Sequence, residues 1–501
     1  MATAAQEETP LFTALKNYMD TGVLPFHVPG HKQGRGLPEF TRFVGRNVMG
    51  IDLTCMDDLD NICNPRGAIR RAEELAAEVW GADHAHFLVN GTTSGIQAMI
   101  MSVCAPGDEI ILPRNAHKSA IGGIILSGAR PVYIEPEIDD YFGIAMGVSA
   151  EKVARALNQH PEAKAVFVIN PTYYGVASPL EEIVRVAHAH GAAVIVDEAH
   201  GAHLSFHPEL PVSGAQAKAD LIATSVHKLA GSMTQSSLLL VNEGLVDPKR
   251  VKAVLNLTQT TSPSYVLLAS LDMARKQMAL KGKELVAKAL RLARWVRAEL
   301  AQVPGLTLLD ETVLNGAGCY AFDPTKIVVN ARELGLSGYE LEKLLRQHFG
   351  IQVELSDLYN VLFLITIGDN WYLVRRLVAA LKAIAAERER LNVVKYPTRL
   401  PELPEQVLSP EEAFYSETRV VPLDQAEGEI SAEMIMAYPP GIPLICPGER
   451  LNREIIDYIN ILKREQLNLQ GTEDPTVSRI KVVKSCLTLV RPRVNLAQHV
   501  G

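Results

Sequence analysis

The sequence lacks the features that mark secreted, membrane-spanning and metal-binding proteins. It has only six cysteines in 501 residues, and they form neither a CxxC pair nor a metal-site spacing, so they are interpreted as reduced thiols of a cytosolic protein. No apolar run reaches the length of a membrane span. The N-terminal residues MATAAQEETP show no basic region followed by an apolar one, so no signal peptide is predicted. These absences favour a cytoplasmic protein with no membrane partner.

An excess of positive charge is also missing. The chain carries 49 Lys and Arg against 57 Asp and Glu, a formal net charge of −8. Nucleic-acid-binding proteins usually have a basic balance, so we expect no nucleic-acid partner. The composition, 47% hydrophobic and 21% charged, is that of a globular protein, and the length predicts two or three domains.

Short β-rich runs alternate with helical patterns between about residues 65 and 245. Several runs are nearly continuous in Val, Ile and Leu, which is typical of strands covered on both faces. The predicted strands are 84–90, 108–113, 130–136, 164–170, 192–198, 220–226 and 236–242. Helices are predicted between them, for example over 68–81 and 179–191, the second with Ser178 as N-cap. This alternation predicts an α/β fold with a doubly wound, mostly parallel sheet.

A smaller α+β region is predicted to follow the large domain. A long helical pattern over 267–303 ends at Pro304-Gly305, and the proline-rich stretch 396–413 resembles a linker. The basic residues of the tail are expected on a solvated face: Lys481, Lys484, Arg491 and Arg493. The expected division is an N-terminal arm (1–64), a large ligand-binding domain (65–300), a small α+β domain (301–395), a linker (396–413) and a C-terminal domain (414–501).

Polar side chains follow several predicted strands, at the sheet edge where α/β proteins bind ligands. The turn NGTTSG (90–95) opens a helix, and its backbone N–H groups and hydroxyls suit a phosphate or carboxylate. It matches neither the dinucleotide nor the NTP glycine motif. The other strand ends carry His117, Asp197 with His200, and His227 with Lys228.

Each of these residues has alternative interpretations when taken alone. Asp197 suits a positively charged ring nitrogen, a metal ion shared with His200 and His203, or a structural turn. Lys228 is either a solvated lysine or an amine nucleophile whose pKa is lowered by desolvation. Together they fit pyridoxal 5′-phosphate (PLP), which requires a lysine, a carboxylate, an anion cradle and a flat group against its ring. A metal site would leave Lys228 and NGTTSG without a role, so no metal is expected.

Longer motifs carry a family resemblance. They are FHVPGHKQG (26–34), VNGTTSG (89–95), PRNAHKS (113–119), INPTYYG (169–175), VDEAHGAH (196–203), ATSVHKLAGSMTQSS (223–237), TSPSYVLLASLD (261–272), VELSDLYN (353–360) and AYPPGIP (437–443). With them the chain resembles the Orn/Lys/Arg decarboxylase family of fold-type I, aspartate aminotransferase-like PLP enzymes. It is most similar to the short members without an N-terminal wing domain, such as the arginine decarboxylases of Gram-positive bacteria.

The resemblance implies a role for each matching residue. Lys228 would bind PLP covalently, and Asp197 would keep the ring nitrogen protonated. Ala199 and His117 would pack on the two ring faces, and His200 would reach the ring hydroxyl. The phosphate would be bound by Thr93, Ser94, Ser225 and His227, and from the neighbouring subunit by Thr261 and Ser262. A homodimer with shared active sites would therefore be the minimum active unit.

The implied reaction is decarboxylation of a basic amino acid, with Lys228 or His227 returning a proton to Cα. Family similarity favours L-arginine, converted to agmatine and CO₂ in polyamine biosynthesis, and leaves lysine and ornithine open. Glu354 and Asp357 are the candidates for binding the cationic side chain, the alternative being a surface acidic pair. Aminotransferases and α-oxoamine synthases share DEAH and the lysine but not the PGHK, RNAHKS and TSPSY motifs. A catalytically silent regulator would usually lose the lysine or the cradle, and both are intact.

Overall fold

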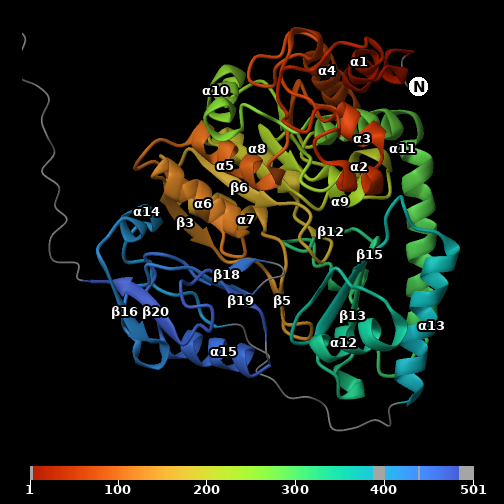
Figure 1. Cartoon of the computed structure of the whole chain (residues 1–501). Coiled ribbons are helices and arrows are strands. Elements are labelled where there is room, and N and C mark those ends of the chain that lie inside the picture. Colours follow the sequence, from red (N-terminus) through yellow and green to blue (C-terminus); the bar gives the residue numbers. More distant parts are fainter. Residues whose placement is uncertain (1–3, 388–400, 438–440, 466, 485–501) are drawn as a thin grey trace, which may run out of the picture. The chain divides into compact units, whose positions relative to one another are not determined.

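The computed structural model describes residues 4–387, 401–437, 441–465 and 467–484, and the chain divides into two compact units, residues 1–400 and 401–501 (Figure 1). Parts of several predictions lie outside the described residues. These are residues 1–3 of the N-terminal arm, 388–395 of the small domain, the start of the linker (396–400), and residues 438–440 (in AYPPGIP), 466 and 485–501 of the C-terminal domain, with Arg491 and Arg493. The finer five-part division stays a prediction.

A seven-stranded sheet forms the centre of the first unit. Its strand order is β1 (His84–Leu88), β10 (Ser237–Val241), β9 (Leu221–Thr224), β8 (Ala193–Glu198), β6 (Ala165–Ile169), β2 (Glu109–Pro113) and β3 (Arg130–Ile134). Neighbouring strands pair in parallel from β9 to β3, while β10 is antiparallel to both β9 and β1. The seven predicted strands and the mostly parallel sheet are confirmed. Their apolar composition follows from burial, because β6, β8, β9 and β10 are buried along their whole length.

Helices cover both faces of this sheet (Figure 1). They are α4 (Ala68–Trp80), α5 (Gly91–Val103), α6 (Lys118–Ser127), α7 (Ala150–Gln159), α8 (Leu180–Ala189), the short α9 (Val226–Leu229) and α10 (Pro248–Thr258). The N-terminal segment adds α1 (Pro10–Asp20), α2 (Pro38–Val44) and α3 (Arg46–Ile51). The predicted N-cap Ser178 is wrong: α8 starts one residue later, with Pro179 at the N-cap position. The Ser178 hydroxyl instead accepts a hydrogen bond from Val148 N at 3.0 Å. This contact with a distant part of the chain takes the place of a hydrogen bond to the start of α8.

One long helix, α11 (Tyr265–Leu300), connects the large sheet to a smaller one, close to the predicted 267–303. Its first half packs Leu268 and Met278 into the core of the large sheet, and its second half packs Val296 and Leu300 into a second core. The second core lies on an antiparallel sheet of β11 (Thr307–Leu308), β13 (Lys326–Asn330), β15 (Asn360–Leu364) and β14 (Leu355–Ser356), with α12 (Gly338–Phe349) and α13 (Trp371–Glu387).

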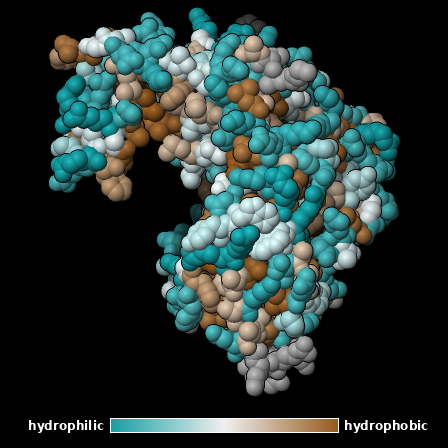
Figure 2. All heavy atoms as spheres, turned by 90° about the vertical axis from the view of Figure 1, so that its right-hand side faces the viewer, coloured by the Kyte–Doolittle hydropathy of each residue, from teal (hydrophilic) through white to brown (hydrophobic). Residues whose placement is uncertain are grey.

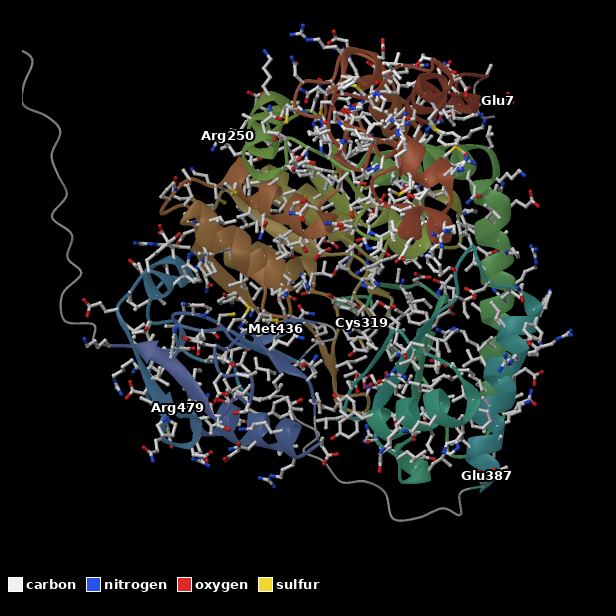
Figure 3. The ribbon with its side chains drawn as sticks, viewed as in Figure 1. Glu7, Arg250, Cys319, Glu387, Met436 and Arg479 are labelled. Atoms are coloured by element: carbon white, nitrogen blue, oxygen red, sulfur yellow. The ribbon has the colours of Figure 1, made fainter. Side chains whose placement is uncertain are left out.

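Two short ribbons complete the first unit. One joins β4 (Ile138–Asp139) to β5 (Ile144–Ala145), and the other joins β7 (Val176–Ala177) to β12 (Ala321–Phe322). The second ribbon matters for the site, because it places the residues that precede β13 beside those that follow β6. Side chains fill the space between these elements, as at the buried Cys319 (Figure 3).

The second unit has its own small core. It contains α14 (Pro410–Phe414), β16 (Thr418–Pro422), β17 (Ile435–Ala437), β18 (Ile442–Ile445), α15 (Arg453–Arg464), β19 (Leu469–Gln470) and β20 (Arg479–Val483). Strand β16 pairs with β20, and β17 lies between β18 and β19. Of the tail lysines, Lys484 is exposed and lies 3.4 Å from Glu417. In the described part of the chain, no helix is both long and apolar enough to cross a membrane.

Candidate active site

Asp197 and Lys228 come together because they end neighbouring parallel strands. Asp197 on β8 lies opposite Ala223 on β9, and Lys228 is on α9, which directly follows β9. The Lys228 amine lies 2.8 Å from Nε2 of His200 and 5.7 Å above the ring of Tyr173. The rings of Tyr173 and His200 are themselves 4.5 Å apart. The structure thus gathers a carboxylate, an amine, an imidazole and a phenol at one edge of the sheet.

Burial sets the electrostatics of the two principal residues. It lowers the pKa of the Lys228 amine, while Asp197 and Glu354 act in the opposite direction. It raises the pKa of Asp197, which is opposed by a 3.0 Å hydrogen bond from Ala199 N and by the charge of Lys228. A larger fraction of the Lys228 amine is therefore neutral than it would be in water. Asp197 is a buried carboxylate, which a cationic partner would stabilise.

Two histidines of the site are held neutral. His117 is the N-cap of α6, with Nδ1 accepting from Ser119 N at 3.2 Å. Burial first, then the charges of Lys228 and Lys118, lower its pKa to about 4. Burial and the charge of Lys228 likewise bring the pKa of His200 well below its usual value. Both rings are flat, uncharged groups near the half-buried amine of Lys228.

The turn predicted to bind an anion forms the start of α5. Thr93 is exposed, and the buried Ser94 donates its hydroxyl to Gly91 O at 2.9 Å. Thr92, which the sequence did not single out, is buried with Oγ1 2.5 Å from Ser225 Oγ and 2.9 Å from Ser237 Oγ. Gly91 N donates to Gln235 O at 2.8 Å. In the described part of the chain no side chain caps α5, so the N–H groups that follow Gly91 in its first turn could bind an anion.

His227 lies at the same end of the sheet. Its Nδ1 lies 2.8 Å from Ser236 O, which orients the ring, and burial lowers its pKa against the effect of that hydrogen bond. Glu354 also acts on the charge of His227, so its carboxylate lies within electrostatic range of the site. The side chain of Glu354 is exposed.

The remaining predicted residues occupy different surroundings. Asp357 accepts hydrogen bonds from Tyr174 Oη at 2.8 Å and from Asn360 Nδ2 at 2.9 Å, so its oxygens are used within the chain. Thr261 and Ser262 lie between α10 and α11 and are exposed in the single chain. His203 contacts Asp323 at 3.0 Å between Nε2 and Oδ2. Among the described residues, no group of three or more His, Cys, Asp or Glu could hold a metal ion.

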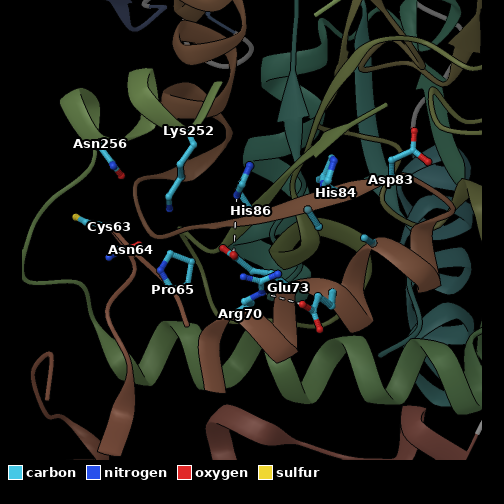
Figure 4. A pocket seen from close by; sticks show the side chains of 13 residues that line it. Cys63, Asn64, Pro65, Arg70, Glu73, Asp83, His84, His86, Lys252 and Asn256 are labelled. Atoms are coloured by element: carbon cyan, nitrogen blue, oxygen red, sulfur yellow. Dashed lines mark hydrogen bonds and ion pairs between the residues drawn. The ribbon is translucent and has the colours of Figure 1, made fainter. Parts of the chain in front are cut away.

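A cavity of about 480 Å³ lies elsewhere, between α4, β1 and α10 (Figure 4). Its lining includes Glu73, His86 and Lys252, with His86 Nδ1 3.9 Å from Glu73 Oε2. It contains none of the predicted site residues, and its charges are of both signs. We therefore place the candidate active site by side-chain chemistry, at Asp197 and Lys228.

The sheet order and the paired aspartate and lysine define an aspartate aminotransferase-like, fold-type I architecture. The family "Orn/Lys/Arg decarboxylase, major domain" matches residues 9–372, and "Orn/Lys/Arg decarboxylase, C-terminal domain" matches residues 395–476. The chain belongs to the Orn/Lys/Arg decarboxylase family, and the predicted resemblance is confirmed.

Individual relatives agree with this assignment. The chain is 48% identical to an arginine decarboxylase of Bacillus subtilis, over 96% of this chain and 99% of the relative. It is 46% identical to an arginine decarboxylase of Bacillus anthracis, over 96% of this chain and 98% of the relative. Among solved structures, lysine decarboxylase LdcF of Francisella novicida matches with a TM-score of 0.84 at 24% identity, over 95% of this chain and 81% of that chain. Lysine decarboxylase A of Pseudomonas aeruginosa matches with a TM-score of 0.81 at 25% identity, over 96% of this chain and 81% of that chain.

Glu198, next to Asp197, yields a prediction about pH and stability. It is fully buried, accepts a 2.5 Å hydrogen bond from Gly214 N, and burial raises its pKa to about 8 from a model-peptide value of 4.5. Between those two pKa values Glu198 is ionised in the unfolded chain and protonated in the folded chain, so its contribution to stability falls as pH rises.

Glu198→Gln should remove this loss and raise the melting temperature at ~pH 8 by at least ~2 °C relative to wild type. Melting curves from ~pH 5 to ~pH 8 check this. Glu284→Gln, at an exposed site on α11, is the control; parallel curves for wild type and Glu198→Gln would contradict the expectation.

Proposed function

We propose that this chain is a PLP-dependent arginine decarboxylase, which converts L-arginine to agmatine and CO₂ as a step towards polyamines. The observation that carries the proposal is the pairing of a buried carboxylate, Asp197, with a half-buried amine, Lys228, at the ends of neighbouring strands. The choice of arginine is supported by the 48% identity to an arginine decarboxylase, compared with 27% to a lysine decarboxylase of Pseudomonas aeruginosa.

The site fits PLP at the atoms that have no partner of their own. His200 Nδ1 is buried without a hydrogen-bond partner, and Ala199 N is the donor found for the Asp197 carboxylate among the described residues. No side chain from the described ranges caps the first turn of α5, where the N–H groups after Gly91 face no capping group. The ring hydroxyl of PLP would bind His200, its protonated ring nitrogen would bind Asp197, and its phosphate would bind the first turn of α5. Lys228 would then hold the aldehyde carbon, and His117 and Ala199 would lie on either side of the ring.

The residues of the chain divide the chemistry between them. When bound, the cofactor supplies an electron sink for the electron pair left by departing CO₂. Asp197 holds its charge opposite a cationic ring nitrogen and so favours that sink. Burial lowers the pKa of His117 to about 4, so at physiological pH it would lie against the cofactor as a flat, uncharged ring. Nζ of Lys228, or the ring of His227, returns the proton to Cα from an adjacent position.

Glu354 is the proposed partner of the substrate side chain. Its carboxylate influences the charges of Lys228, His227 and Lys326, yet it makes no hydrogen bond or ion pair of its own among the described residues. A guanidinium suits such a free carboxylate because it can bind it through two N–H groups. Asp357 is proposed to act alongside it by holding the hydroxyl of Tyr174, since its own oxygens are occupied.

A substrate panel tests the proposed function. Wild type with added PLP should release CO₂ from L-arginine at least ~10-fold more efficiently than from L-lysine or L-ornithine, a difference of about 1.4 kcal/mol in transition-state binding. Glu354→Gln should lower kcat/KM for arginine by ~10-fold, mainly through KM, since it removes one charge-assisted contact. Glu333→Gln, at an exposed position, is the control. Faster turnover of lysine or ornithine would reassign the substrate, and no CO₂ from any of the three would refute the function.

We also propose that the active unit is a homodimer. The N-terminal segment exposes large apolar side chains in the single chain: Phe26 is 93% exposed and Phe43 is 89% exposed. Leu257, four residues before Thr261, is 78% exposed. Figure 2 shows apolar side chains reaching the surface among hydrophilic ones over the upper part of the face that it presents. Covering them with a second copy would remove a large apolar area from water and bring Thr261 and Ser262 to a partner's phosphate.

A further inference from the structure

Lys326 is a charged side chain buried beneath the active site without a full set of partners. It is the first residue of β13 and has no exposed surface. Its amine donates to His200 O at 3.2 Å and lies 3.9 Å from Asp323 Oδ2. Among the described residues this buried ammonium has one hydrogen bond and one distant carboxylate, an arrangement that is costly for folding. Such a residue therefore calls for an explanation beyond stability.

The segment that carries Lys326 is fixed firmly in place. Asp323 N donates to Gly175 O at 2.8 Å, and Asp323 Oδ1 accepts from the Thr325 hydroxyl at 2.6 Å. Arg297 of α11 donates its Nε to Pro324 O at 3.0 Å. Asp323 Oδ2 also contacts His203 Nε2 at 3.0 Å. Residues 323–326, which lead into β13 of the small sheet, are thus joined to residues 200 and 203, which follow the strand of Asp197.

The contact reaches the reactive amine in two steps. Lys326 holds the backbone carbonyl of His200, and the ring of the same histidine lies 2.8 Å from the Lys228 amine. The positive charges of Lys228 and Lys326 both act, after burial, to keep His200 neutral. Burial lowers the pKa of Lys326 to about 8; Asp323 opposes this effect and the charge of Lys228 adds to it. The two lysines are therefore coupled through one histidine.

We propose that Lys326 is a positioning residue: by binding the carbonyl of His200 from the small sheet, it orients that ring against Lys228 and adds a positive charge beneath it. The inference rests on the proposed function, because it gives Lys228 and His200 a role at the cofactor. It assigns no contact between Lys326 and substrate or cofactor. Its consequence is that the small sheet sets the protonation of the active-site amine.

The test uses the pH dependence of the visible absorbance of the PLP-loaded enzyme. Lys326→Met removes the charge and the hydrogen bond, and should raise the pH midpoint of the spectral change by ~0.5–1 unit, because a nearby positive charge no longer opposes protonation. Lys326→Gln keeps a donor for His200 O but not the charge, and should show the same shift with a smaller loss of kcat. Lys152→Met is the matched control, since Lys152 also donates to one carbonyl, Glu135 O at 3.1 Å, beside one carboxylate, Glu137 at 3.1 Å.

The outcomes separate this inference from the proposed function. A wild-type enzyme that acquires no visible absorbance with PLP would refute the function itself. A wild type with normal absorbance, and Lys326 variants whose midpoints match it, would overturn only the role of Lys326. A variant that merely melts earlier, with an unshifted midpoint, would also overturn it, since that is the result of a purely structural lysine. If the Met variant does not fold, the midpoint of the Gln variant decides.

Discussion

Lys228→Ala should lower kcat for arginine decarboxylation by at least about 10³-fold, the scale of loss when a covalent nucleophile is removed. The reason is that the proposed nucleophile is its half-buried amine, which follows β9 and lies 2.8 Å from Nε2 of His200. Purified protein should also lose the visible absorbance that reports covalently bound PLP. CO₂ release and an absorbance scan measure the two effects.

The control is Lys343→Ala, at an exposed position of α12, which should leave both readings at the wild-type level. A Lys228→Ala protein with full turnover would contradict the role of this amine. Mixing Lys228→Ala with a Thr261→Ala/Ser262→Ala double variant extends the experiment to the dimer. If sites are shared between subunits, hybrid dimers contain one site with every group intact, and part of the activity returns; activity no greater than that of the two variants measured separately would contradict sharing.

Asp197→Asn should retain bound PLP but lower kcat by about 10²–10³-fold, the scale seen when one group that stabilises transition-state charge is lost. The amide keeps an oxygen for the hydrogen bond from Ala199 N, so the fold of the loop is preserved. It cannot hold the ring nitrogen in its cationic form. Steady-state rates on arginine and the spectrum of the loaded enzyme measure the effect.

Asp220→Asn is the matched control for this second substitution. Asp220 is also a buried aspartate of the same sheet, but it precedes β9 and binds His188 at 2.8 Å and Val194 N at 2.7 Å, at the opposite edge. We expect it to lower thermal stability and to leave kcat within a few-fold of wild type. Equal losses of kcat in both variants would show that Asp197 acts only by stabilising the fold.

Much of the site could be predicted from sequence because strand ends in an α/β sheet are local features. Asp197 closes a continuous apolar strand, and Lys228 follows the next one, so parallel pairing alone brings them to the same edge. The sequence pointed to Thr93 rather than Thr92 because the two threonines are adjacent in the NGTTSG motif. Only the orientation of α5 decides that the Thr92 hydroxyl, and not that of Thr93, contacts Ser225. Asp357 was predicted to bind the substrate side chain, with a surface acidic pair as the alternative, and the sequence could not show that Tyr174, distant in the chain, donates its hydroxyl to this carboxylate.

The sequence by itself determined the α/β architecture, the family, and the residues whose chemistry is carried by short motifs. Periodicity and motif spacing are local properties of the chain, so they can be recognised without knowledge of the fold. Only the tertiary structure decided which side chains are buried together, such as Lys326 beneath His200, 126 residues apart. Burial and partner distance set the pKa of each group, and they depend on packing between distant segments rather than on neighbours in the chain.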